Sequence, residues 1–186
     1  MVIAFYVSFI TLSYIRKYKK WIDLIEYLLP VSIFFIIPDW FLSDKLGVLA
    51  FPIKSNINFG TVPSYLVGMW SISLFLLVYS CLTYYEKSND ILKRNLLIVG
   101  LSFFIFILSD ETLWQLSLWH YKDVKAYGHL PYFMLLPNLL IGFHVYYAYQ
   151  FVSKKSIIYK IAAAFITMFI RFALIAGSYY IVEVLL

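Results

Sequence analysis

Apolar residues form six long runs along the chain, separated by shorter polar segments. The runs cover approximately residues 1–15, 21–42, 63–85, 92–109, 131–152 and 157–184. A helix that crosses the hydrocarbon core of a bilayer needs about 20 apolar residues, with a range of roughly 17–25. The first run is shorter than this, and the others reach it. We therefore predict an all-α integral membrane protein, with residues 1–186 forming one domain of about six transmembrane helices.

The basic residues predict which way these helices cross. Ten lysines and arginines follow the first, third and fifth runs, and four lie in the other connections. Cytoplasmic loops are enriched in Lys and Arg, so both termini are expected outside the cytoplasm, across a bacterial-type cytoplasmic membrane. The first run has no basic residue before it and no small-residue cleavage pattern, which favours an uncleaved anchor. The long connections 39–62 and 110–130 then face outward.

The composition excludes several classes of protein. The chain is 63% hydrophobic and only 13% charged, against about 45–50% apolar and about 25% charged residues in soluble domains. This excludes a soluble enzyme and a nucleic-acid-binding protein, and it makes membrane lipid the expected partner. The single Cys81 excludes an intrachain disulfide. The spacing of His120 and His129 matches no metal-ligand pattern, so we expect neither a metal nor a cofactor.

The two outward connections resemble each other. Each runs from a helix through an acidic exit and an aromatic segment to Gly-x-x-Pro and the next helix. A proline suits the first turn of a helix, where its missing N–H costs nothing. Two parallel repeats explain the match, and chance similarity between two apolar segments is the alternative. The matched pairs are Asp39 with Asp110, Leu42 with Leu113, Leu46 with Leu116, Gly60 with Gly128 and Pro63 with Pro131.

The first connection also resembles a known family. The stretch from Asp39 to Phe51, followed by Gly60 and Pro63, is similar to the lycopene-cyclase-domain membrane proteins of carotenoid biosynthesis. Members of that family carry paired carboxylates after the proline, where this chain has Ser64 and Tyr65. The resemblance implies a small helical membrane bundle and acid-catalysed chemistry on an isoprenoid lipid.

The second connection holds the densest group of polar and aromatic residues. If residues 110–120 are helical, Glu111, Trp114 and Gln115 share one face. A carboxylate held against indole rings near the hydrocarbon boundary can keep a proton and act as a general acid. Aromatic faces beside it can stabilise a carbocation. The alternative is that the acids end a helix at the interface while the tryptophans anchor it.

We therefore predict Glu111, Asp110 and Asp39 as acid groups of a lipid site. Trp40, Trp114 and Trp119 would form its apolar walls. Solvated helix ends are the alternative for the two aspartates.

Polar residues near the middle of the last two runs need a separate explanation. His144 and Arg171 are ionisable groups at a depth that costs roughly 2.5–3.5 kcal/mol or more, so both should face the bundle interior. Asn138 lies on the same run as His144, beside Pro137, which can kink the helix. Asn138, His144 and Arg171 are therefore predicted to line a polar groove that receives a substrate headgroup. A structural hydrogen bond from Arg171 to another helix is the alternative.

Three functions remain open from the sequence. The first is a membrane-embedded enzyme or binding protein for an apolar, isoprenoid-like lipid, of the cyclase or isomerase kind if it is an enzyme. The second is a small transporter or channel subunit, which would use Arg171, His144 and Asn138. The third is a non-catalytic subunit or assembly factor, bound to a membrane partner protein or to further copies of itself.

Overall fold

A computed structural model describes residues 2–53, 55, 57–85 and 90–186, and within these ranges the chain forms six long helices. All six lie on the predicted apolar runs, so the all-α prediction is confirmed. The helices are α1 (Val2–Ile15), a continuous run of α2 (Lys19–Phe34), α3 (Ile36–Trp40) and the π-helix η1 (Phe41–Lys45), then α4 (Tyr65–Tyr85), α5 (Ile91–Thr112), α6 (Tyr132–Val152), and α7 (Ile157–Tyr179) continued by the π-helix η3 (Tyr180–Leu185).

Four of these helices are long and apolar enough to cross a membrane, namely Lys19–Lys45, Tyr65–Tyr84, Ile91–Thr112 and Ile157–Leu185. The chain is therefore an integral multi-pass membrane protein. Helix α1 has 14 residues, about 21 Å at 1.5 Å per residue, against a hydrocarbon core of roughly 30 Å. Helix α6 has the length, at 21 residues, but several tyrosines and three other polar side chains reduce its hydropathy.

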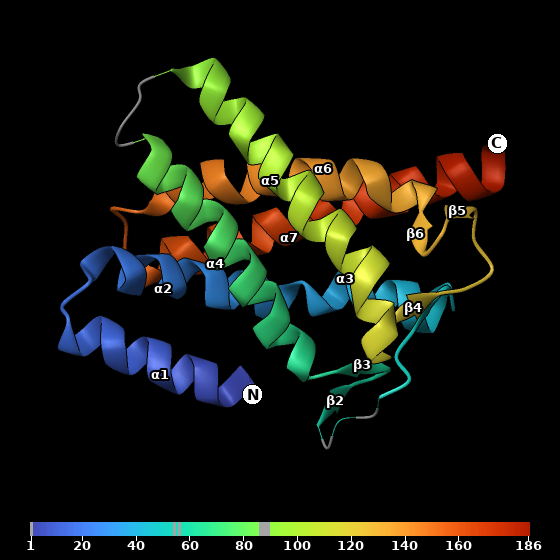
Figure 1. Cartoon of the computed structure of the whole chain (residues 1–186), viewed down its shortest axis with the longest axis horizontal. Coiled ribbons are helices and arrows are strands. Elements are labelled where there is room, and N and C mark those ends of the chain that lie inside the picture. The colour runs from blue at the N-terminus through green and yellow to red at the C-terminus, as the bar shows by residue number, and fades with distance from the viewer. Residues whose placement is uncertain (1, 54, 56, 86–89) are drawn as a thin grey trace.

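Helix α7 packs against both α2 and α6 (Figure 1). Helix α5 packs against α4 and α6. The contact between α5 and α6 is close at Gly142, where a Cβ atom would collide with the side chain of Ser102. Small residues allow such approaches between membrane helices. The largest apolar core fills the space between α2, α4, α5, α6 and α7.

Short strands gather at one end of the bundle, together with the C-terminus (Figure 1). Strand β1 (Leu49–Ala50) pairs antiparallel with β4 (His120–Tyr121), so the two connections are joined to each other. Strands β2 (Asn58–Phe59) and β3 (Val62–Pro63) form one hairpin, and β5 (Ala126–Tyr127) and β6 (Leu130–Pro131) form another. A helix-only prediction did not include these strands. The two hairpins are set by two-residue turns, and the pairing of β1 with β4 is set by the packing of the two connections against each other.

The two hairpins have matching geometry. Gly60 and Gly128 begin the turns with φ of +61° and +62°, a conformation that glycine adopts without steric cost. After each hairpin a backbone N–H donates back across it, from Ser64 to Ile57 at 3.1 Å and from Tyr132 to Lys125 at 3.0 Å.

The prolines occupy different positions from those predicted. Pro63 ends strand β3, and Pro131 ends β6 and caps α6, so neither lies inside the first helical turn. The hairpin requires an extended residue at this point, and Pro131 has a ψ of 137°. The proline ring fixes φ near the helical value. It therefore still favours the start of a helix, but the helix begins one or two residues after the proline.

At the opposite end of the bundle, a buried lysine joins α7 to α2. Lys160 forms salt bridges with Asp23 and, at 2.7 Å, with Glu26, and Tyr149 of α6 donates to Asp23 at 2.8 Å. We refer to Lys160, Asp23, Glu26 and Tyr149 as the Lys160 cluster. It holds three helices together with every charged group paired.

Candidate functional site

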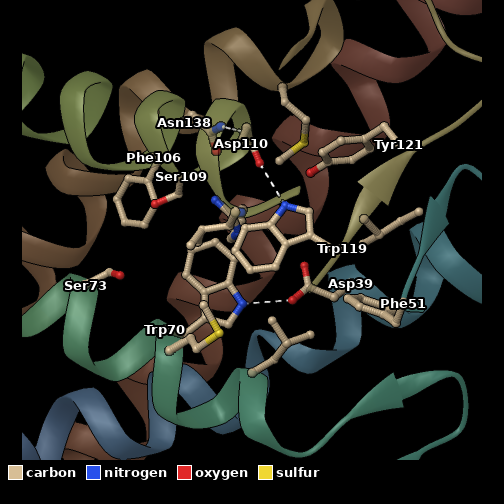
Figure 2. A pocket seen from close by; sticks show the side chains of 16 residues that line it. Asp39, Phe51, Trp70, Ser73, Phe106, Ser109, Asp110, Trp119, Tyr121 and Asn138 are labelled. Atoms are coloured by element: carbon tan, nitrogen blue, oxygen red, sulfur yellow. Dashed lines mark hydrogen bonds between the residues drawn. The ribbon is translucent and has the colours of Figure 1, made fainter. Parts of the chain in front are cut away.

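A cavity lies near the hairpin end of the bundle, between the helices and the paired strands β1 and β4 (Figure 2). Its volume is about 60 Å³, and it opens on one side to its surroundings. Its wall is mostly apolar and aromatic, with a few buried polar groups. The lining residues are Asp39, Leu49, Phe51, Leu66, Met69, Trp70, Ser73, Phe106, Ser109, Asp110, Leu113, Trp119, Tyr121, Met134, Asn138 and Arg171.

Asp39 reaches the cavity from an irregular part of its helix. The α-helix is interrupted at Phe35, between α2 and α3, Pro38 lies within α3, and the last turns, from Phe41 to Lys45, are π-helical. Such irregular turns are frequent at functional sites because they re-aim side chains. Asp39 is 5% exposed, and its carboxylate accepts a hydrogen bond of 2.8 Å from the indole Nε1–H of Trp70 on α4.

Asp110 lies in the last turn of α5 and is 7% exposed. Its carboxylate accepts hydrogen bonds from Trp119 Nε1–H at 3.2 Å and from Asn138 Nδ2–H at 2.9 Å (Figure 2). Trp119 can reach back because the α-helix ends at Thr112 and Ser117 has a φ of +54°. Residues 110–120 therefore do not form one helix, so the condition under which Glu111, Trp114 and Gln115 would share a face is not met.

Arg171 is fully buried on α7. Its guanidinium lies over the ring of Trp70 at 4.4 Å from the ring centroid and over that of Phe35 at 5.1 Å. Asp39 and Asp110 are within electrostatic range of it. Among the residues that the structure describes, however, Nε, Nη1 and Nη2 have no hydrogen-bond partner. The cavity thus contains two carboxylates and one guanidinium that lie near one another, and no hydrogen bond joins the guanidinium to either carboxylate.

Tyr121 contributes a hydroxyl from strand β4, on the wall formed by the paired connections. Burial, and next the negative charges of Asp110 and Asp39, raise the pKa of Tyr121 well above its ordinary value of 10.0. The phenol therefore stays protonated and can donate a hydrogen bond at any physiological pH. Together these groups suit an apolar molecule with a polar end.

A family model described as a domain of unknown function, DUF6989, matches residues 36–182. The chain belongs to this family. No curated protein and no solved structure matches the chain, and these comparisons show no link to lycopene cyclases. All the cavity-lining residues fall within the DUF6989 range, whereas α1 and α2 precede it.

The structure brings together five of the residues predicted for a site in this DUF6989 chain. Asp39, Asp110, Trp119, Asn138 and Arg171 all line the cavity. They come from four helices and a connection that are far apart in the sequence.

The remaining predicted residues lie elsewhere. Glu111 accepts a hydrogen bond of 3.2 Å from the backbone N–H of His129 and packs over Gly128. Trp40 packs over Gly60, and the Nζ of Lys45 lies 4.9 Å from the centroid of the Trp40 ring. Each residue directly after the cavity aspartate thus covers the glycine of its own hairpin. Neither is among the described residues that line the cavity.

Two further predicted residues complete this placement. The ring of His144 is half-buried on α6, outside the lining residues, with an Nε2 atom that finds no partner among the described residues. The side chain of Trp114 lies outside the described residues.

Sequence reasoning missed Trp70 and Tyr121. Trp70 lies seven residues after Pro63, and Asn138 lies seven residues after Pro131. Each donates to the aspartate of its own connection. Extending the alignment of the two connections past the prolines would have placed Trp70 beside Asp39. In the described part of the chain, no group of three His, Cys, Asp or Glu side chains could hold a metal ion.

Proposed function

We propose that this membrane protein binds an apolar, isoprenoid-like lipid in the cavity and acts on it through Asp39 and Asp110. One observation carries the proposal. Two buried carboxylates, each held by an indole N–H, face an apolar cavity walled by aromatic rings. Cavities of this kind, mostly apolar with a few converging polar groups, are typical ligand sites.

The charges in the cavity support acid chemistry. Two carboxylates and the guanidinium of Arg171 carry a net charge of −1, and one proton on either aspartate makes the group neutral. A low-dielectric site favours the neutral state. A carboxylic acid that keeps its proton beside Trp70 and Trp119 can protonate a double bond, and the indole faces can stabilise the resulting carbocation. Cyclisation and isomerisation of a polyene both begin with this step.

We propose further that the two units, from Asp39 to Trp70 and from Asp110 to Asn138, are parallel repeats. Equal hairpin turns, equal backbone hydrogen bonds and equal donor spacing support this. The pairing of β1 with β4 has the symmetry expected of a two-fold axis, since Leu49 pairs with Tyr121 and Ala50 with His120. The cavity then lies between the repeats, near their common axis.

The full topology is also a proposal. We infer six crossings with both termini outside the cytoplasm, so that the cavity opens toward the outer leaflet. The excess of basic residues at the end opposite the hairpins supports this orientation. Helix α6 packs between α5 and α7, two helices of membrane length, which supports a crossing for it.

The proposal can be tested by identifying lipids that copurify with the wild-type protein and with Asp39→Asn, Asp110→Asn and Glu111→Gln. Native mass spectrometry would detect the bound species, and a lipid analysis of the expressing cells would detect a product. We expect a bound isoprenoid-like lipid for the wild type and Glu111→Gln, and loss of any product in both aspartate variants. Asp44→Asn, at an exposed position on the same helix as Asp39, is the matched control.

Two results would contradict the proposal. The absence of any apolar lipid in the wild-type protein would exclude a lipid site in the cavity. A product that persists in both aspartate variants and disappears only in Glu111→Gln would move the acid group out of the cavity and onto the hairpin.

A further inference from the structure

The buried guanidinium of Arg171 has hydrogen-bond donors that meet no acceptor among the described residues. Arg171 is fully buried, and its three nitrogens are without hydrogen-bond partners in the described part of the chain. The rings of Phe35 and Trp70 hold its plane but accept no conventional hydrogen bond. A buried donor without a partner costs free energy, and a charged one costs more. An acceptor from outside the described part of the chain would therefore lower the free energy of the buried guanidinium.

The neighbouring carboxylates are turned toward other donors. Asp39 accepts from Trp70, and Asp110 accepts from Trp119 and Asn138. Figure 2 shows Trp70 reaching Asp39, and Trp119 and Asn138 reaching Asp110. The geometry thus keeps the aspartates and the guanidinium near one another while leaving the guanidinium donors free for a third group.

We propose that Arg171 binds the oxygen of a neutral headgroup, a hydroxyl or a carbonyl, on the apolar ligand of this cavity. This inference rests on the proposed function and names its substrate class. The apolar body of the ligand would lie against Trp70 and Trp119, and the phenol of Tyr121 can donate to the same oxygen. Arg171 is a binding residue in this arrangement, and the aspartates remain the acid groups.

The charge balance selects a neutral headgroup over the two charged alternatives. An anionic headgroup would add negative charge to a cavity that already has two carboxylates for one guanidinium. An ammonium headgroup would meet the guanidinium at the place where the free donors lie. A neutral oxygen satisfies those donors without changing the net charge, so it has the lowest desolvation cost.

Three probes with one tail test this inference: farnesol, farnesoic acid and farnesylamine. Their affinities for the purified protein in lipid nanodiscs can be measured by quenching of tryptophan fluorescence. We expect farnesol to bind at least about 10-fold more tightly than either charged probe. Arg171→Met should weaken farnesol binding by about 10-fold or more, the usual value of a hydrogen bond to a charged group, and should remove the preference for it.

Arg94→Met is the matched control, because Arg94 also lies over two aromatic rings, those of Tyr146 and Tyr147, but near the start of α5 and away from the cavity lining. It should leave all three affinities unchanged. Arg171→Lys provides a second variant that keeps the charge and loses the planar donors. Its farnesol affinity should fall between those of the wild type and Arg171→Met. If the methionine variant does not fold, the lower farnesol affinity of Arg171→Lys than of the wild type tests the inference by itself.

The outcomes separate this inference from the proposed function. Tight binding of all three probes without preference, or tightest binding of the acid or the amine, overturns the neutral headgroup and leaves the lipid site standing. Unchanged farnesol affinity in Arg171→Met and Arg171→Lys overturns the role of Arg171, since water then satisfies its donors. Failure of every probe to bind the wild type contradicts the isoprenoid site and the inference together.

Discussion

Helix α7 carries two buried cations on one face, about three turns apart, and their surroundings differ completely. Lys160 is paired with Asp23 and Glu26 in a cluster that joins three helices. Arg171 is more deeply buried, and its nitrogens are without hydrogen-bond partners among the described residues. The first arrangement is what a structural ion pair requires. The second leaves hydrogen-bond donors without an acceptor among the described residues. Because of this contrast, we propose a binding role for Arg171 and a structural role for Lys160.

The largest expected effect is the loss of stability in Lys160→Met. Breaking a buried pair costs roughly 3–5 kcal/mol, and about 2–3 kcal/mol is expected here because the carboxylates can partly rehydrate. Asp23 and Glu26 have side chains that are 26% and 45% exposed. Arg171→Met breaks no hydrogen bond to a described side chain, and the two aspartates that it leaves can take up a proton, so it should cost less than Lys160→Met. Thermal unfolding in detergent measures the stability of both variants, with Lys154→Met at an exposed position as the control. Equal losses of stability in Lys160→Met and Arg171→Met would contradict the difference proposed between the two cations.

The two cavity aspartates should differ in their contributions. Asp110 accepts from two donors and Asp39 from one. An asparagine at 110 turns an NH2 group toward one of these donors, so Asp110→Asn should cost about 2 kcal/mol, whereas Asp39→Asn can keep its single bond and should cost about 1 kcal/mol. Unfolding midpoints would show the order. The reverse order would mean that Arg171 stabilises Asp39 more than the indole does.

The hairpin glycines provide a test of the two connections. In Gly60→Ala the new Cβ would meet Trp40 at 2.9 Å, and in Gly128→Ala it would meet Glu111 at 2.6 Å. Each should cost about 1–2 kcal/mol, since the positive φ and the collision add. Gly47→Ala is the matched control, with a φ of +69° and open space around it, so it should cost about 1 kcal/mol from φ alone. If Gly47→Ala lost as much stability as the other two variants, Trp40 and Glu111 would be moving away from the new Cβ atoms at little cost.

The smallest effect is expected at the end of the bundle that holds the Lys160 cluster. Asp90 caps α5 by accepting from the backbone N–H of Lys93 at 3.1 Å, which lowers the pKa of Asp90 below its ordinary value of 3.8. Because the folded-state pKa is lowered, the stabilisation is present above that ordinary value and fades as the pH falls through the folded-state pKa. The Asp90→Ala variant should therefore be less stable than wild type at neutral pH and equal to it in strong acid. A difference that does not change with pH would assign the effect to helix propensity.

The hairpin residues show why local sequence was insufficient for part of the site. Glu111 and Asp110 are adjacent, and both were predicted as acid groups from the same aromatic surroundings. The tertiary structure separates them, because Asp110 faces the cavity and Glu111 faces the turn at Gly128. Neighbouring residues on a helix point in directions about 100° apart, so which of them faces a cavity depends on where the next helix packs.

The sequence by itself determined the helices, their membrane environment and the likeness of the two connections. Runs of apolar residues fix helix length, because a backbone in lipid has to satisfy its hydrogen bonds internally. Only the tertiary structure decided which partners the buried polar groups meet. Trp70 reaches Asp39, and Asn138 reaches Asp110. Helix α7 supplies one paired cation and one whose donors meet no acceptor among the described residues. These contacts join residues far apart in the chain, and such partners follow from packing rather than from local periodicity.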